Sequence, residues 1–123
     1  MILADTSVWI DHPRKGLPTL ATALEEGQVL MHPFVLGELA CGNLGNRRNV
    51  LRFLAFFPAV PAATDPEVLE FIERRALMGR GIGYIDFHLL ASVALAAPAR
   101  LWTLDRRLAS VAAELELAFR EKG

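Results

Sequence analysis

Short apolar runs alternate with segments of helical periodicity along the chain, and this alternation constrains the fold more than any other feature. Residues 1–4, 28–31 and 100–104 are short and apolar, as expected of strands covered on both faces. The segments between them repeat apolar residues three or four positions apart, which is typical of helices on a core. The order predicts an α/β fold with a short, mostly parallel sheet.

Proline, glycine and capping residues set the boundaries that we expect for the helices. The first begins near Val8 and is broken by the His12–Gly16 segment, and Pro33 marks the start of another. Further helices are expected over residues 17–26, 47–57, 64–78, 84–97 and 106–115. Two more strands are expected over residues 58–63 and 117–119.

Length and composition restrict the classes of protein. A chain of 123 residues fits one domain, so we expect residues 1–123 to form a single unit. The single cysteine, Cys41, excludes an intrachain disulfide and a cysteine-only zinc site. No apolar run approaches the ~18–20 residues of a membrane span, and no basic segment precedes the first apolar run. We therefore expect a cytoplasmic protein without a membrane partner.

The charge balance does not decide the kind of substrate. Thirteen basic and fourteen acidic side chains give a formal net charge of −1, whereas nucleic-acid binders are usually more basic. Eleven of the thirteen cations, however, are arginine, which suits bidentate contact with phosphate. If four acids were neutralised by a metal, the balance would become positive, so a polyanionic substrate is not excluded.

Four acidic residues stand where their charge is hard to explain by solvation alone. Asp5 and Asp105 each follow a predicted strand, at the end where open α/β sheets bind ligands. Glu38 and Asp86 interrupt strongly apolar helical segments, where an ionised carboxylate is costly unless it is paired or bound to metal.

Each acid also has an ordinary interpretation. Asp5 and Asp105 stand at strand-to-helix turns and Asp86 near a helix start, so all three could cap helices. Glu38 could face solvent. The hypothesis of a shared site depends on all four acids occurring together.

Four hard oxygen ligands gathered at one end of the sheet would suit Mg²⁺ or Mn²⁺. Such a metal supports phosphoryl chemistry, because it activates a water and neutralises charge on the leaving oxygen. Ser7 and Thr103 could support the carboxylates through their hydroxyls. Arg80, in the glycine-rich segment 79–83, is a candidate phosphate contact, and the helical pair Arg106 and Arg107 could line a nucleic-acid groove.

The four acids lie in motifs that resemble those of the PIN-domain ribonucleases, and most closely the VapC-type toxins of type II toxin–antitoxin pairs. The resemblance covers nearly the whole chain. Its segments are Ile2–Ile10 around Asp5, Gly37–Leu39 around Glu38, Gly81–Ala91 around Asp86, and Thr103–Leu108 around Asp105.

The resemblance implies a three-layer α/β/α sandwich and Mg²⁺- or Mn²⁺-dependent endonucleolytic cleavage of RNA, leaving a 5′-phosphate and a 3′-hydroxyl. It implies Asp5, Glu38, Asp86 and Asp105 as the catalytic and metal-binding acids. It also implies a cognate antitoxin, and a homodimer or a toxin–antitoxin hetero-oligomer. Some members carry a further acid after the fourth motif, where this chain has Arg106 and Arg107, so the number of metal ions stays open.

Two other classes stay open on the residues alone. A phosphatase or receiver domain that forms an aspartyl phosphate would also place an aspartate, here Asp5, at a strand end. A dehalogenase-type phosphatase, however, needs a second aspartate where Ser7 stands, and a receiver needs a lysine where Arg106 stands. The third class is a PIN-like module that binds RNA without cutting it.

Overall fold

The computed structural model describes residues 1–15 and 17–121. Within those ranges the chain forms seven helices and a three-stranded sheet, in the order β1 (Ile2–Ala4), α1 (Thr6–Lys15), α2 (Pro18–Glu25), β2 (Val29–Leu30), α3 (Pro33–Ala40), α4 (Arg47–Ala55), α5 (Asp65–Arg75), α6 (Tyr84–Leu95), β3 (Arg100–Trp102) and α7 (Arg106–Glu114).

The sheet is parallel, with β1 between β2 and β3. Leu3 of β1 stands opposite Leu30 on one side and Leu101 on the other. Parallel strands need crossover connections, and the helices between the strands supply them. The alternation of strands and helices in the sequence therefore predicted the α/β class and the parallel sheet correctly.

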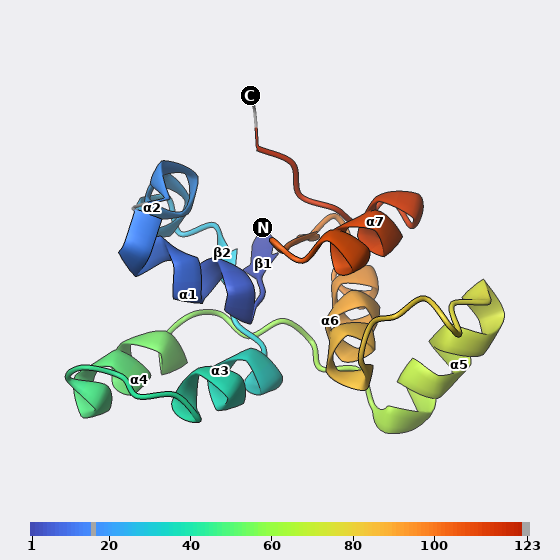
Figure 1. Cartoon of the computed structure of the whole chain (residues 1–123), viewed down its shortest axis with the longest axis horizontal. Coiled ribbons are helices and arrows are strands. Elements are labelled where there is room, and N and C mark those ends of the chain that lie inside the picture. The colour runs from blue at the N-terminus through green and yellow to red at the C-terminus, as the bar shows by residue number, and fades with distance from the viewer. Residues whose placement is uncertain (16, 122–123) are drawn as a thin grey trace.

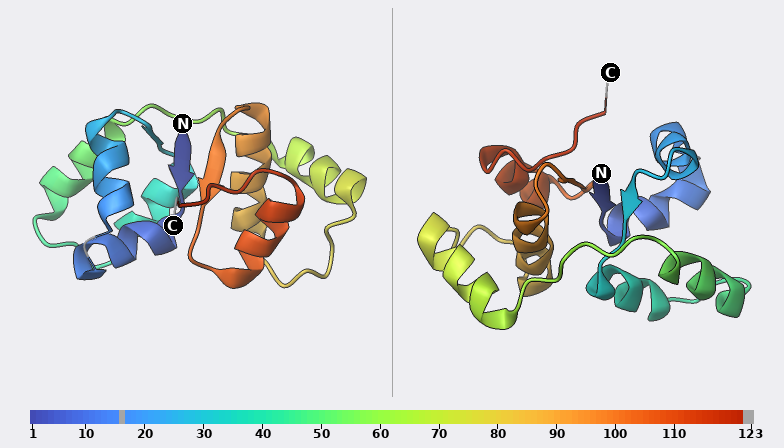
Figure 2. Two further views of the ribbon diagram at one scale, coloured as in Figure 1. Left: turned by 90° about the horizontal axis from the view of Figure 1, so that it is seen from above. Right: turned by 180° about the vertical axis from the view of Figure 1, so that it is seen from behind.

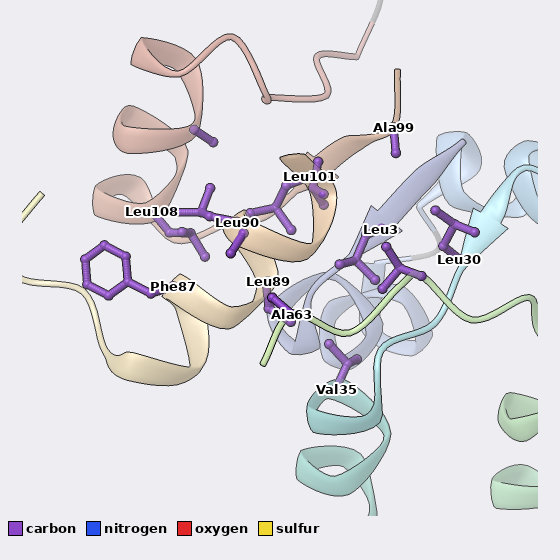
Figure 3. Close-up of a cluster of buried hydrophobic side chains, with 14 of the residues drawn as sticks. Leu3, Leu30, Val35, Ala63, Phe87, Leu89, Leu90, Ala99, Leu101 and Leu108 are labelled. Atoms are coloured by element: carbon purple, nitrogen blue, oxygen red, sulfur yellow. The ribbon is translucent and has the colours of Figure 1, made fainter. Parts of the chain in front are cut away.

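Each face of the sheet is covered by its own hydrophobic cluster, because successive side chains of a strand point to opposite faces. Leu3, Leu30 and Leu101 belong to a cluster that includes residues of α3, α6 and α7 (Figure 3). Their neighbours Ala4 and Trp102 pack in a second cluster with residues of α1 and α2. The strands thus lie between helices α1 and α2 on one side and α6 and α7 on the other (Figures 1 and 2). This is the three-layer arrangement that the resemblance implied.

Two helix ends differ most from the prediction. α1 continues to Lys15 instead of breaking at His12, since Pro13 removes only one hydrogen bond near the end of the helix. α5 ends at Arg75 rather than Met78, because Ala76 adopts a left-handed conformation with φ of 53°. Alanine is an unusual residue for such a cap, which explains why the sequence did not mark this end.

The two additional strands are present only as isolated parallel bridges. Ala59 pairs with Met31 beyond β2, and Ala118 pairs with Leu101 of β3. The prolines at 58 and 61 have no N–H to donate, so longer pairing does not form in that segment. Among the described residues, no helix combines the length and the apolar character that crossing a membrane requires.

Candidate active site

Polar side chains from β1 and β3 meet where the two neighbouring strands end. Asp5 directly follows β1 and Thr103 directly follows β3. The Thr103 hydroxyl donates a hydrogen bond of 2.5 Å to Asp5 Oδ2, and Ser7 Oγ donates one of 2.5 Å to Asp5 Oδ1. Both hydroxyls predicted to support the carboxylates therefore contact the same one.

These two hydroxyls also fix the turn between β3 and α7. The Leu104 amide donates to Ser7 Oγ at 3.0 Å, and the Asp105 amide donates to Thr103 Oγ1 at 3.0 Å. Each hydroxyl thus donates to Asp5 and accepts from the backbone that leads into Asp105. The network holds the first and fourth acidic motifs in one place.

The environment of Asp5 disfavours its charge. The side chain is buried, and this burial raises the pKa of the carboxyl above its ordinary value, although hydrogen bonds from Ser7, Thr103 and the Val8 amide act in the opposite direction. A buried carboxylate that has two hydroxyl donors, and no cationic partner among the described residues, gains from a positive ligand.

Glu38 reaches the same region from α3. It is exposed, as its ordinary interpretation predicted, and its Oε1 accepts a hydrogen bond of 2.6 Å from Thr6 Oγ1. Thr6 was not among the predicted residues. The signal for it was its place directly after Asp5, between two residues that were selected.

Asp86 connects the four acids electrostatically. It is half-buried in the first turn of α6, where it accepts a hydrogen bond of 3.3 Å from the Gly83 amide. Burial raises the pKa of Asp86 most, and repulsion from Asp5, Asp105 and Glu38 raises it further, in that order. The fold therefore brings Asp5, Asp105 and Glu38 close enough to Asp86 to repel its charge.

The capping interpretation is also correct for the three aspartates. Asp105 caps α7 by accepting from the Leu108 amide at 2.9 Å, and Asp5 accepts from the Val8 amide at 3.3 Å. These bonds fix the direction of each side chain without supplying a positive charge. Capping and membership of an acidic site are therefore compatible here.

The donor set fits a divalent metal by its chemistry. Carboxylate oxygens are the ligands that Mg²⁺ and Mn²⁺ prefer, and the mutual repulsion at Asp86 is what a bound cation would relieve. As the side chains stand, the described residues contain no group of three or more acidic, histidine or cysteine side chains gathered tightly enough to hold a metal ion. The acids are thus neighbours, held by hydroxyls and amides, rather than a closed metal cage.

Comparison with known proteins identifies the family of the chain. No family model matches the chain. Two curated proteins, both named Ribonuclease VapC32, are 46% identical to it over 122 residues, covering 99% of this chain and 98% of each relative. They come from Mycobacterium tuberculosis strains CDC 1551 / Oshkosh and ATCC 25618 / H37Rv. The chain belongs to the VapC family of toxin ribonucleases. The resemblance found in the sequence is thereby confirmed.

The three arginines singled out in this VapC chain have different surroundings. Arg80 forms two hydrogen bonds with the Glu114 carboxylate, of 2.8 and 2.7 Å, so its guanidinium is engaged within the protein. Arg107 lies against Gly81 of the loop before α6. Arg106 is exposed at the first position of α7.

Proposed function

We propose that this VapC chain is a Mg²⁺- or Mn²⁺-dependent endoribonuclease, the toxin component of a toxin–antitoxin pair. The observation that supports the proposal most directly is the repulsion of Asp86 by Asp5, Asp105 and Glu38. Such a concentration of negative charge destabilises a fold unless a cation uses it. The name of the two relatives supports RNA as the substrate.

We assign the direct metal ligands to Asp5 and Asp86, with Asp105 completing the site. A divalent ion bound there supplies an activated water and neutralises charge on the departing oxygen. Ser7 and Thr103 orient Asp5 through their hydrogen bonds to its two oxygens. Correct orientation of a ligand by its outer partners is commonly worth roughly 10- to 100-fold in affinity or activity.

Glu38 is assigned a ligating or water-positioning role. Thr6 holds its Oε1, and within residues 1–15 and 17–121 no hydrogen bond to Oε2 is formed. This second oxygen is free to accept a proton from an attacking water at the exposed side of the site. Attack in line with the leaving oxygen would leave a 5′-phosphate and a 3′-hydroxyl.

The test is cleavage of a structured RNA by the purified chain with Mg²⁺, with Mn²⁺ and with EDTA, compared with Asp5→Asn. The matched control is Asp65→Asn, which removes one carboxylate charge outside the four acids. We expect cutting with metal only, loss in Asp5→Asn and retention in the control. End-group analysis of the fragments checks for the 5′-phosphate.

Two outcomes would contradict the proposal. Release of phosphate from a monoester with intact RNA would indicate a phosphatase. Tight RNA binding without cutting, with either metal, would indicate a non-catalytic PIN-like module.

Partners follow from the toxin assignment. We propose a cognate antitoxin that covers the site in the cytoplasm, and a homodimer or a toxin–antitoxin hetero-oligomer as the assembly. Exposed apolar side chains such as Phe56, which is 80% exposed, and Phe53 support a surface that other chains cover. Co-purification with a small protein encoded beside this chain, and inhibition of cutting by it, would test the pairing.

A further inference from the structure

Arg107 rests on a glycine of the loop that precedes Asp86. A Cβ atom added at Gly81 would fall 2.9 Å from Nη1 and 3.2 Å from Cδ of Arg107, so any other residue there would displace this guanidinium. Gly81 lies two residues before Gly83, whose amide caps Asp86. The same loop therefore holds the third acid and provides the seat for Arg107.

Arg107 has no acceptor of its own. Within the parts of the chain that the structure describes, no hydrogen bond or ion pair is formed by its guanidinium, whereas Arg80 on the same loop is fully engaged by Glu114. An arginine that is positioned by packing, and not by an acid, keeps its donors for a ligand.

The position of Arg107 also opposes the helix dipole. Arg106 and Arg107 occupy the first turn of α7, which contains no acidic residue. Cations are disfavoured at this positive end of a helix, and an anion bound beside them removes that penalty. Asp105, the N-cap of α7, supplies one carboxylate at this end, and a bound phosphate would add a second anion beside Arg107.

Arg107 lies beside two segments that carry acids of the site. It follows Asp105 by two residues in the sequence, and its guanidinium lies against Gly81, five residues before Asp86. The seat on Gly81 therefore keeps this cation beside the loop that leads to the third acid. A phosphodiester chain that crosses the carboxylates would meet this guanidinium beside the reacting bond.

We propose that Arg107, seated on Gly81, binds a backbone phosphate of single-stranded RNA and positions the chain across the acidic site. This inference rests on the proposed ribonuclease function and assigns its phosphate-binding residue. Planar guanidinium groups bind phosphate through two parallel hydrogen bonds, which fixes the position as well as the charge.

The first experiment measures binding of a single-stranded RNA oligonucleotide in EDTA, where no cutting occurs, at several salt concentrations. The variants are Arg107→Ala and Arg107→Lys, and Arg106→Ala is the matched control with the same charge loss in the same turn. We expect Arg107→Ala to weaken binding about tenfold and to reduce the salt slope by about 0.7, as for one phosphate contact on a single strand. Arg106→Ala should change affinity less than about twofold.

The second experiment tests the contact between Arg107 and Gly81 by comparing substitutions at two glycines of the same loop. Gly79 and Gly81 have similar positive φ values of 74° and 79°, but a Cβ at Gly79 meets nothing within 4 Å. Gly79→Ala and Gly81→Ala therefore carry the same backbone strain, and only Gly81→Ala displaces Arg107. We expect RNA affinity to fall in Gly81→Ala alone, with no further loss when Arg107→Ala is added.

In cleavage assays with metal, Arg107→Ala should raise KM more than it lowers kcat. Equal effects of Arg106→Ala and Arg107→Ala, equal effects of the two glycine variants, or a wild-type chain that binds no RNA at low salt would each overturn the inference. A wild-type chain that binds RNA through Arg107 but never cuts it would overturn the proposed function and leave this assignment standing.

Discussion

Two carboxylates of this protein are both held by hydrogen bonds but lie in different surroundings. Asp5 is buried, accepts from the hydroxyls of Ser7 and Thr103, and lies among like charges. Asp65, with its side chain 73% exposed, accepts from Tyr84 Oη at 2.8 Å and lies 3.0 Å from His88 Nε2.

The regions around these two carboxylates differ in whether the carboxylate already has a histidine partner. Among the residues that the structure describes, none of the four acids forms an ion pair, so their charge is available to a ligand. The second region, which we call the histidine cluster, consists of His32, Phe34, Asp65, Tyr84 and His88. Its rings contact one another, with Phe34–His88 and Tyr84–His88 centroids 4.8 and 4.6 Å apart. Removing a carboxylate charge should therefore stabilise the fold in the acidic site and destabilise it in the histidine cluster.

The largest expected effect is at Asp86. Asp86→Asn should lower RNA cleavage by more than the roughly 100-fold typical of outer partners of a metal. In EDTA it should raise the melting temperature, because it removes a half-buried charge repelled by three acids. Cleavage kinetics and thermal unfolding on the same preparation measure both. A lower melting temperature with unchanged cleavage would show that Asp86 is neither destabilised by its neighbours nor needed for cutting.

The next effect is the pH dependence that His32 brings to the histidine cluster. Burial, assisted by repulsion from His88, lowers the pKa of His32 to about 4 from 6.5. Between these two pH values His32 is protonated in the unfolded chain but not in the folded chain. The free energy of unfolding therefore falls as the pH drops from about 6.5 to about 4. The total loss is up to about 3 kcal/mol.

Urea unfolding at a series of pH values measures this loss, with His32→Asn as the control. Asparagine keeps an acceptor for the Phe34 amide, which His32 Nδ1 now binds at 2.9 Å, but does not titrate. An identical pH profile in the variant would show that His32 is not responsible.

A smaller loss of stability is expected when Asp65, the acid of the histidine cluster, is replaced. Asp65→Ala leaves the buried Nε2 of His88 without its partner, which costs about 2 kcal/mol. Asp65→Asn keeps an oxygen acceptor and should lose less. Both variants should cut RNA at the wild-type rate, measured per folded molecule. A loss of cleavage as large as that of Asp86→Asn would place Asp65 in the active site.

The smallest effect concerns the hydroxyl that supports Asp5. Thr103→Val preserves the shape of the side chain but removes its bonds to Asp5 and to the Asp105 amide. We expect cleavage to fall about tenfold. Thr22→Val on α2 makes the same exchange on the exposed surface and should leave the rate unchanged. Equal rates in the two variants would remove Thr103 from the supporting role.

The parts of the fold that the sequence predicted are those governed by local pattern. Apolar runs located β1, β2 and β3, and strand-end aspartates located two of the acids, because both signals lie within a few consecutive residues. The choice of Glu38 and Asp86 followed from the cost of an acid in an apolar helix. The prediction that the four acids lie close together did not follow from local pattern. The repulsion of Asp86 by the other three supports it.

The remaining features depend on contacts between distant segments. Thr6 meets Glu38 across 32 positions, and Asp65 meets His88 across 23, so neither pair leaves a local signal. The same holds for the seat of Arg107 on Gly81, which requires α7 to lie over the loop before α6. The type of a residue can mark it as a candidate for catalysis, but the contacts that hold it in place are visible only in the folded structure.

The two isolated bridges cover the outer strands of the sheet. Met31 is paired by the 58–60 segment through bonds of 2.8 and 2.9 Å, and Leu101 by the 117–119 segment through bonds of 2.7 and 2.8 Å. Both outer borders of a very small sheet are therefore already partnered. Exposed strand borders are what nucleate ribbon-like aggregates, and here neither offers a long free row of amides to a second molecule. A chain that is 53% hydrophobic is in this way protected against joining its copies strand to strand.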